Sequence, residues 1–337
     1  MNISIFFIIL SLINFFLYKN LNQLSKNFNI YDIPDNDRKL HKIEVPLLGG
    51  IFIFFSFLLY LFFLILSPSH SLLQDLNFIN LKNFISFFIC CFSLLIVGIY
   101  DDKFNLNANI KLFLLASLIA ITLSLNTELQ INVLRFEVFN EINLGYLSLP
   151  FTILCILLFI NAFNMFDGIN MQSGLYSSIF FVYFLTSNAF VSLSIVMIIS
   201  IIFFLINNST SKLFLGDSGS IFISFLISMI IIHSYNDGYI RDVDTIFILM
   251  MLPGIDMFRL FILRIWKRSN PFKSDRNHLH HLLIINFGYK KTLFYIQLLI
   301  IIPILLSFLI NKIFVAVTTI LIYIFVIKSL YKKSKSF

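Results

Sequence analysis

The sequence predicts an all-α polytopic membrane protein with ten or eleven membrane-spanning helices. Of its 337 residues, 59% are apolar and only 12% are charged, with a mean hydropathy of +0.93, whereas soluble domains are about 45–50% apolar and about 25% charged. The apolar residues form runs that are long enough to cross a bilayer, and the basic residues gather between alternate runs. Both a soluble globular protein and a disordered chain are therefore excluded.

Eleven apolar runs meet or approach the ~20 residues that a spanning helix needs. In order they are residues 3–18, 48–66, 84–100, 112–125, 149–163, 174–187, 189–206, 221–235, 245–265, 292–310 and 313–331. The fourth to sixth runs are short, so a count of ten also fits. The first run lacks the flanking signals of a cleaved signal peptide. Without internal repeats or linkers, the sequence predicts a single domain over residues 1–337.

The distribution of basic residues predicts the orientation. If the N-terminus lies outside, 20 of the 24 Lys and Arg residues fall on the cytoplasmic side. The four exceptions are Lys82, Arg135, Arg241 and Lys312. Because Lys and Arg collect on cytoplasmic loops, we expect this orientation. The net charge of +7 is then a signal of topology, and no soluble basic face predicts binding to nucleic acid.

The longest outer loop, residues 126–148, shows period-two alternation. The alternating stretches are residues 130–133 and 134–138. Alternation of this kind is typical of short strands. We therefore expect a small extracytoplasmic β-hairpin.

Five polar segments remain, and all of them fall on the predicted cytoplasmic side. They are residues 32–42, 101–105, 161–170, 214–220 and 271–281. Acidic residues at helix ends are costly in so apolar a protein unless they are paired or bind a cation. A transporter would more often bury such groups at the membrane midplane. The segments therefore predict one site at the cytoplasmic membrane face.

The acids and amides in these segments suit a hard cation. Asp101 and Asp102 repel each other, so Mg²⁺ or a Lys such as Lys111 should offset them. Mg²⁺ usually takes one or two protein carboxylates. Asn164 and Asp167 are three residues apart and face the same way on a helical turn. Taken singly, each motif also fits a solvated helix end, a cap or a turn.

Two further sets of residues allow more than one interpretation. The imidazoles of His278, His280 and His281 suit a metal by residue type, but beside Arg276 they favour a basic lid over a phosphorylated sugar. A solvated juxtamembrane loop is the alternative. Asp256 and Arg259 lie three residues apart and predict an ion pair that staples one helix.

Taken together, the five segments resemble the polyprenyl-phosphate N-acetylhexosamine-1-phosphate transferases of glycosyltransferase family 4. The bacterial undecaprenyl-phosphate N-acetylglucosamine-1-phosphate transferases are the most similar branch. The resemblance extends from Asp32 to Tyr289, and residues 271–281 discriminate most, because the muramyl-pentapeptide branch carries three consecutive histidines there. Asn105 and Asn170 depart from the commoner acidic residues, which affects the fine recognition of nucleotide and sugar.

The resemblance implies a reaction and its setting. A phosphate oxygen of undecaprenyl phosphate would attack the β-phosphorus of a UDP-N-acetylhexosamine, giving undecaprenyl-diphospho-sugar and UMP. This step would initiate the synthesis of a cell-surface polysaccharide such as O-antigen or teichoic acid. The implied cofactor is Mg²⁺, with Mn²⁺ as the alternative. The implied location is a bacterial inner membrane with the active site facing the cytoplasm, and dimers are common in the family, so a homodimer is allowed.

The resemblance also implies roles for individual residues. Asn164 and Asp217 would hold the metal, and Asp167 would orient metal or substrate. Asp101, supported by Asp102, would engage the lipid phosphate, which Lys111 would also bind. The remaining residues would contact the sugar nucleotide: Gly168, Asn170 and Phe214 the uracil, Arg276, His278, His280 and His281 the sugar and diphosphate, and Lys42 of the first loop the nucleotide.

Alternatives stay open from the sequence. A flippase or transporter of lipid-linked sugars would be equally polytopic but would release no UMP, and a scaffold protein would need none of the acids. The sugar could also be N-acetylgalactosamine, N-acetylfucosamine, N-acetylquinovosamine or muramyl-pentapeptide. A single hydroxyl separates some of these sugars, and the sequence does not place it.

Overall fold

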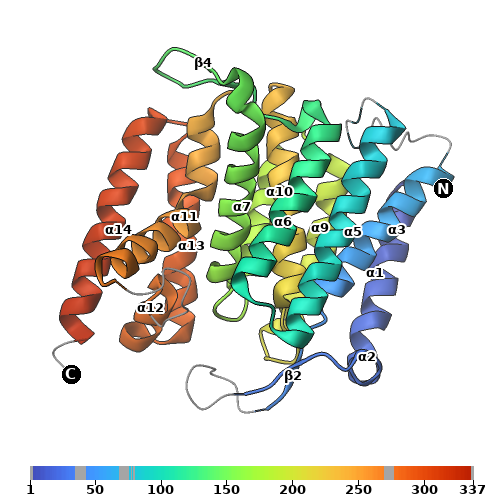
Figure 1. Cartoon of the computed structure of the whole chain (residues 1–337). Helices are drawn as coiled ribbons and strands as arrows, with labels where there is room; N and C mark the ends of the chain where they lie inside the picture. The colour runs from blue at the N-terminus through green and yellow to red at the C-terminus, as the bar shows by residue number, and fades with distance from the viewer. Residues whose placement is uncertain are drawn as a thin grey trace.

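The computed structural model of the protein describes residues 3–34, 43–67, 76, 78, 80–268 and 277–334. Long helices run side by side in alternating directions (Figure 1). In chain order they are α1 (Ile3–Lys19), α2 (Leu21–Phe28), α3 (Gly49–Leu66), α5 (Leu81–Phe104), α6 (Ala108–Leu125), α7 (Ser148–Phe166), α8 (Gln172–Thr186), α9 (Val191–Asn208), α10 (Gly216–Asn236), α11 (Val243–Trp266), α12 (Leu279–Phe287), α13 (Tyr289–Leu306) and α14 (Lys312–Ser334).

Each of the eleven predicted apolar runs forms most of a helix, which confirms the all-α polytopic fold. Within the described ranges, nine helices are long and apolar enough to cross a membrane, or ten if α1 and α2, bent by 69°, form one span. The run at 174–187 forms α8, which has 15 residues. At 1.5 Å per residue its length is about 22 Å, less than the ~30 Å hydrocarbon core.

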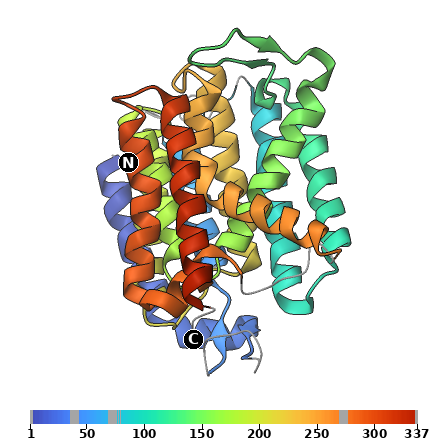
Figure 2. The same ribbon diagram turned by 90° about the vertical axis from the view of Figure 1, so that its left-hand side faces the viewer.

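Helix α11 is strongly bent, a feature that the apolar run at 245–265 does not predict. Its second half lies almost across the direction of the other helices (Figure 2). Pro253 lies inside this helix, and a proline removes a backbone hydrogen bond and clashes with the preceding turn. The helix ends at Trp266, which is 84% exposed. The bend carries this half of α11 away from the central bundle.

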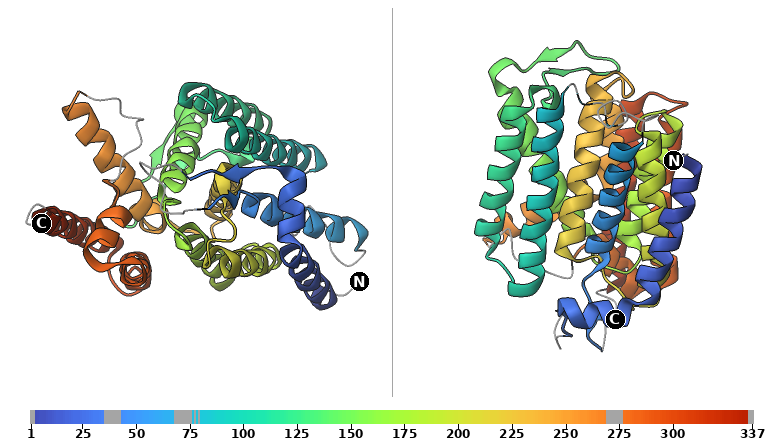
Figure 3. Two further views of the ribbon diagram at one scale, coloured as in Figure 1. Left: turned by 90° about the horizontal axis from the view of Figure 1, so that it is seen from below. Right: turned by 90° about the vertical axis from the view of Figure 1, so that its right-hand side faces the viewer.

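Helix α10 forms the centre of the molecule, as the view from below shows (Figure 3, left). Its most apolar stretch is completely buried, and α3, α5, α7 and α8 pack against it. Because protein surrounds it, α10 accommodates hydroxyls at successive turns. Ser224 donates to the carbonyl of Ser220, and Ser228 donates to that of Ser224, at 2.5 and 2.8 Å.

Two glycines let neighbouring helices touch the backbone of α10. A Cβ on Gly50 of α3 would lie 2.1 Å from the Gly219 nitrogen, and a Cβ on Gly98 of α5 would lie 2.4 Å from the Ser218 Cα. Only glycine permits backbones to approach so closely. As a result, the end of α5, which bears Asp101 and Asp102, lies against the first turn of α10.

A β-hairpin is present in the 126–148 loop, but its second strand is not the predicted one. Strand β3 (Val133–Leu134) pairs antiparallel with β4 (Ile142–Asn143), whereas the sequence placed the second strand at 134–138. The intervening backbone docks on α10 and α11 instead. The Arg135 N–H donates to the hydroxyl of Tyr235 at 2.6 Å, and the Glu137 N–H donates to Asp244 at 2.8 Å. Two short 3₁₀ turns, η1 (Thr127–Leu129) and η2 (Gly145–Leu147), flank the hairpin.

Two small elements at the opposite end were not expected from the sequence. Strand β1 (Tyr31–Asp32) pairs antiparallel with β2 (Val45–Pro46). Helix α12 occupies residues that the sequence assigned to a loop. Its leucines at 279, 282 and 283 share one buried face, as expected from their i, i+3, i+4 spacing.

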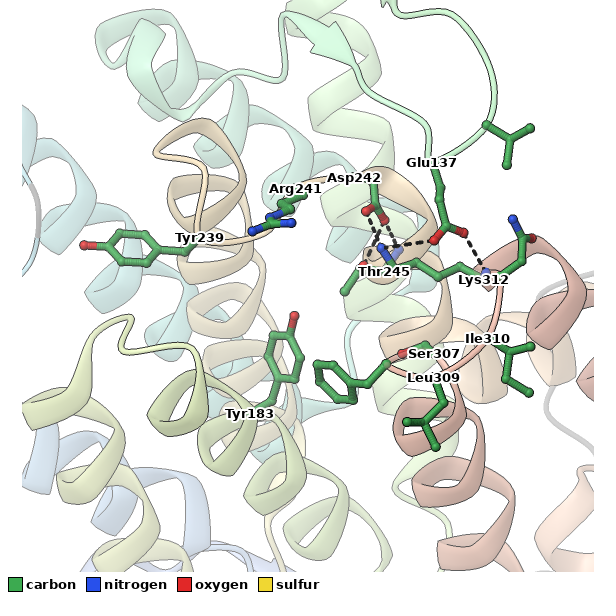
Figure 4. Close-up of a pocket in the computed structure, with 13 residues that line it drawn as sticks. Glu137, Tyr183, Tyr239, Arg241, Asp242, Thr245, Ser307, Leu309, Ile310 and Lys312 are labelled. Atoms are coloured by element: carbon green, nitrogen blue, oxygen red, sulfur yellow. Dashed lines mark hydrogen bonds and ion pairs between the residues drawn. The ribbon is translucent and has the colours of Figure 1, made fainter.

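At the hairpin end, a pocket of about 670 Å³ lies between α8, the start of α11 and the α13–α14 connection (Figure 4). Lys312, the first residue of α14, forms an ion pair with Asp242. Its N–H also donates to Glu137 at 2.7 Å. Asp242 caps α11 by accepting from the Thr245 N–H at 2.9 Å. The ion pair between Asp242 and Lys312 joins the start of α11 to the start of α14.

Candidate active site

A cavity of about 950 Å³ lies at the end of the bundle opposite the hairpin, where α5 ends and α10 begins. It brings together most of the predicted site residues. Those that line it are Asp101, Asp102, Asn164, Asp167, Gly168, Asn170, Phe214, Asp217, His278, His280 and His281. Lys111 contacts two of these acids, as described next. Lys42 and Arg276, which were also predicted, lie outside the described residues.

Lys111 bridges two carboxylates from different helices. Its Nζ lies 2.6 Å from Asp101 Oδ2 and 2.9 Å from Asp217 Oδ2. The other oxygen of Asp101 accepts the Leu106 N–H at 2.7 Å, which fixes the turn between α5 and α6. Two carboxylates and one ammonium leave a net charge of −1. This corner of the cavity therefore favours a further cation.

Asp102 has a different position from its neighbour. Its carboxylate accepts the backbone N–H groups of Asp217 at 2.7 Å and of Ser218 at 3.0 Å. A carboxylate at this position caps the helix and complements the helix dipole. Gly216 has φ +76°, and a Cβ there would lie 2.6 Å from Asp102 Oδ2. The geometry favours a role in which Asp102 positions Asp217.

Asn164 and Asp217 supply the donors predicted to hold a metal. The Asn164 amide donates to Asp217 Oδ1 and to Ser220 Oγ, the latter at 2.8 Å. In the part of the chain that the structure describes, no three His, Cys, Asp or Glu side chains form a ready-made metal cluster. Mg²⁺ needs none, because it usually takes one or two carboxylates and leaves the rest to water and phosphate. This oxygen-rich pair fits Mg²⁺ or Mn²⁺ better than zinc.

Asp167 follows the last residue of α7 and lines the same cavity as Asn164 and Asp217. Its side chain accepts a hydrogen bond from the Ser173 hydroxyl of α8. Burial raises the pKa of its carboxyl to about 7. Gly168 follows, and a Cβ there would lie only 2.1 Å from His280 Nε2. The link between α7 and α8 therefore packs directly on α12.

The histidines of the last segment form a row of rings. The rings of His278 and His280 are nearly parallel, 5.6 Å apart, and His281 lies 4.3 Å from His280. His280 is 2% exposed, and burial, with its histidine neighbours, holds its pKa well below the usual range. Its Nε2 has no hydrogen-bond partner among the described residues. Among the described residues no three His, Cys, Asp or Glu side chains are placed to hold a metal ion together, and the basic lid stays a prediction.

Asn170 and Phe214 line the cavity, and each has partners within the protein. The side-chain amide of Asn170 donates to Ser211 Oγ at 2.7 Å, and the backbone carbonyl of Asn170 accepts from the Tyr289 hydroxyl at 3.0 Å. The Phe214 carbonyl accepts the Gly49 N–H at 3.0 Å. Tyr289 also lines the cavity, and the sequence did not assign it a role. Its position at the end of the resemblance was the only available signal.

Asp256 makes more contacts than the sequence predicted. The predicted ion pair with Arg259 is present at 2.8 Å. However, the same carboxylate also accepts from His278 Nδ1 at 2.8 Å and from the Tyr323 hydroxyl at 2.7 Å. It therefore does more than staple its own helix. A single acid inside an apolar run was the signal.

Comparison with known proteins shows the family of the chain. The model of glycosyl transferase family 4 matches residues 84–235, a stretch that includes Asp101, Asn164 and Asp217. The undecaprenyl-phosphate alpha-N-acetylglucosaminyl 1-phosphate transferase of Yersinia pestis is 30% identical over 264 residues, covering 74% of this chain and 68% of the relative. The chain belongs to glycosyl transferase family 4.

Other members of the family have similar coverage. The protein of the same name from Salmonella typhi is 27% identical over 293 residues, covering 81% of this chain and 75% of its own. A probable undecaprenyl-phosphate N-acetylglucosaminyl 1-phosphate transferase of Bacillus subtilis is 29% identical over 262 residues, covering 75% and 69%. The match to the family model ends at residue 235, so it does not include the histidines of α12.

Proposed function

We propose that the protein transfers a sugar 1-phosphate, foremost N-acetylglucosamine 1-phosphate, from a UDP-N-acetylhexosamine to undecaprenyl phosphate. The products are undecaprenyl-diphospho-sugar and UMP. The names of the relatives support the acceptor and the sugar. The observation that carries the proposal is the meeting of Asp101, Asp217, Lys111 and the α12 histidines around one cavity at the end of the bundle.

The cavity suits a reaction between two anions. The phosphate of the lipid and the diphosphate of the nucleotide repel each other, so cationic groups must offset their charge. Lys111 binds the attacking phosphate as a point charge, and Asp101 and Asp217 fix the position of its ammonium. A phosphate near neutral pH is already largely ionised. Asp101 therefore needs only to orient the lipid phosphate.

A divalent cation completes the charge balance in this proposal. Asp217 and Asn164 would hold Mg²⁺ or Mn²⁺, which supplies Lewis-acid stabilisation of the diphosphate. Asp102 holds the first turn of α10 and with it Asp217. The hydrogen bond from the Ser173 hydroxyl fixes the side chain of Asp167 in the same cavity.

The other wall of the cavity would hold the sugar nucleotide. Gly168, Asn170 and Phe214 form the pocket for the uracil, and His280, which also lines the cavity, packs its buried Nε2 against Gly168. His278 and His281 complete this wall. We assign Lys42 and Arg276, which lie outside the described residues, to the same ligand on the resemblance alone.

The proposal includes a position in the cell. We place the cavity on the cytoplasmic face of a bacterial inner membrane and the N-terminus outside, on the strength of the basic residues at the cavity end. The product would begin the synthesis of a surface polysaccharide. A homodimer is part of the family resemblance and carries no part of the mechanism.

The test is the release of UMP by the purified protein. With undecaprenyl phosphate, UDP-N-acetylglucosamine and Mg²⁺, we expect UMP and lipid-linked sugar in equal amounts, and no product when EDTA is added. Mn²⁺ should restore part of the activity. A panel of other UDP-N-acetylhexosamines then ranks the donors. A protein that moves lipid-linked sugar across vesicles and releases no UMP would be a flippase, and the proposal would be wrong.

A further inference from the structure

We propose that Asp256 and Tyr323 are positioning residues for the sugar-nucleotide side of the active site. Together with Arg259 they fix the start of α12, and through it the imidazoles of His278 and His280. The inference rests on the proposed function. It adds two residues, one from α11 and one from α14, to which neither the resemblance nor the comparisons give a role.

The first step is the buried carboxylate of Asp256, which is 4% exposed. It accepts hydrogen bonds from three different side chains, at 2.7 to 2.8 Å, and from the Leu279 N–H at 3.2 Å. The three side chains are Arg259, His278 and Tyr323. A buried carboxylate is costly unless its lone pairs are satisfied. This set of donors satisfies them and joins three helices at one point.

The second step concerns the start of α12. Asp256 accepts from both the ring of His278, the N-cap residue, and the first backbone N–H of the helix. The carbonyl before it, that of Asn277, accepts from Arg259 at 2.7 Å. Side chain, N–H and carbonyl are therefore all held by α11 across the junction 277–279. The orientation of α12 follows from these contacts.

The third step concerns the histidine ring itself. The side chain that accepts from one ring nitrogen sets the tautomer and the direction of the ring. Because Nδ1 of His278 faces Asp256, Nε2 is the nitrogen that remains for a ligand in the cavity. The parallel ring of His280 stacks on His278 and contacts Gly168. Displacement of His278 therefore displaces His280 as well.

The fourth step brings in α14. The Tyr323 hydroxyl donates to Asp256 and accepts from Arg259 Nε, both at 2.7 Å. Tyr323 is 1% exposed. Its phenol closes a ring of hydrogen bonds with the carboxylate and the guanidinium. A change in α14, far along the chain from the acids of α5 and α10, thus reaches the cavity through one hydroxyl.

The experiment compares Asp256→Asn and Tyr323→Phe with two matched controls. Asp242→Asn also removes a carboxylate that joins α11 to α14, but at the opposite end, where Lys312 is its partner. Thr319→Val also removes a buried hydroxyl from α14, one that bonds, among the described residues, to the Val315 carbonyl of its own helix. These controls share the loss of stability and lack the contact with α12.

We expect Asp256→Asn to lower kcat/KM for the UDP-sugar by about 10- to 100-fold, the scale of a misplaced binding group, with KM for undecaprenyl phosphate within about twofold. Tyr323→Phe should show a smaller change of the same kind. In His278→Ala, adding Asp256→Asn should cost little more, because Asp256 acts through that ring. Equal losses in Asp242→Asn and Asp256→Asn, or equal effects on both substrates, would show a merely structural role and overturn the inference.

A second readout is independent of activity. Hydrogen exchange of the backbone amides of residues 279–287 should accelerate in Asp256→Asn and Tyr323→Phe and stay unchanged in Asp242→Asn and Thr319→Val. If the wild-type protein releases no UMP, the proposed function fails, and exchange still tests the positioning. Unchanged exchange in Asp256→Asn would overturn the inference whatever the activity.

Discussion

Adjacent residues in the sequence make different contacts in the candidate active site. The carboxylate of Asp101 pairs with Lys111, whereas Asp102 accepts the backbone N–H groups of Asp217 and Ser218 in the first turn of α10. The sequence Asp101-Asp102 predicted acidic residues at this site. It did not predict that the carboxylate of Asp102 would cap the N-terminus of α10. That distinction depends on the left-handed Gly216, which brings the α10 N-terminus against α5.

Replacement of Asp217 by Asn should abolish most of the activity while the fold is retained. The amide keeps the shape but loses the charge that pairs with Lys111 and would hold the cation, so we expect UMP release to fall by at least ~100-fold. Thermal unfolding should shift by only a few degrees. Asp244→Asn, a matched change at the hairpin end, should leave turnover intact. Turnover of Asp217→Asn near the wild-type rate would contradict the proposed site.

Gly168 tests the contact between the α7–α8 link and α12. An added Cβ would lie 2.1 Å from His280 Nε2, so Gly168→Ala must push the imidazole away, and we expect KM for the UDP-sugar to rise by about 10-fold or more. Gly254→Ala is the control, because within the described ranges nothing beyond its own turn of helix lies within 4 Å of the new Cβ. The measurement is steady-state UMP release. Similar kinetics in both variants would argue against a role for this contact.

At the scale of residues, the sequence identified the acids, the amide and the histidines by type and order. It did not identify their partners. Asp256 and His278 are 22 positions apart, and they meet because the chain after α11 brings the start of α12 back to the middle of that helix. An apolar run carries no information about the bend of α11 beyond the presence of Pro253.

At the scale of elements, hydropathy predicted the long helices because the bilayer fixes their length and composition. The positions of short elements depend on tertiary contacts instead. The second strand of the hairpin lies at 142–143 because the backbone after β3 bonds to α10 and α11. Helix α12 has nine residues, too few for hydropathy to separate it from a loop.

The contact between α5 and α10 should be intolerant of any side chain. Gly98→Ala would bring a Cβ to 2.4 Å from the Ser218 Cα, where only backbone could yield. Overpacking of this kind usually costs about 1–3 kcal/mol. We expect a lower unfolding temperature and slower UMP release, since both acids of α5 move away from Asp217. An unfolding temperature equal to that of Gly254→Ala would show that the helices adjust freely.

The junction of α11 and α14 at the hairpin end should weaken in acid. Burial alone would raise the pKa of Asp242, but hydrogen bonds from Lys312 and Thr245 outweigh it and lower the pKa. The folded protein therefore binds fewer protons than the unfolded chain, whose Asp pKa is about 3.9. Stability is present above that pH and falls as the pH drops below it.

We expect the unfolding temperature of the wild-type protein to fall more between pH 6 and pH 3 than that of Asp242→Asn. The variant has no carboxyl to protonate at this site, so its change in unfolding temperature measures the effects of acid elsewhere in the protein. Parallel loss in the two proteins would show that the Asp242–Lys312 pair contributes nothing to the pH dependence.

At the scale of the whole molecule, the hairpin and the cavity lie at opposite ends of the bundle. The orientation proposed above then places the hairpin outside the cell. Tyr146 lies in η2 and is fully exposed, and Lys26 lies exposed on α2 at the cavity end. Two of the native cysteines, Cys90 and Cys91, are buried, which limits background labelling.

Tyr146→Cys should therefore react with an impermeant maleimide on intact cells. Lys26→Cys should react only after the membrane is opened. The measurement is labelling with and without permeabilisation, and the unmodified protein gives the background. The reverse pattern would place the cavity outside and contradict the proposed use of a cytoplasmic sugar nucleotide.

The enclosure of α10 has a consequence for how the surrounding membrane influences catalysis. The apolar stretch of α10, the helix that bears Asp217, is completely buried among the outer helices, so lipids should contact those helices instead. Changes in acyl-chain length or headgroup should therefore affect delivery of the long-chain acceptor far more than the geometry of the acids. Enzyme reconstituted in thin and thick bilayers would then differ in its dependence on acceptor concentration while sharing one saturated rate.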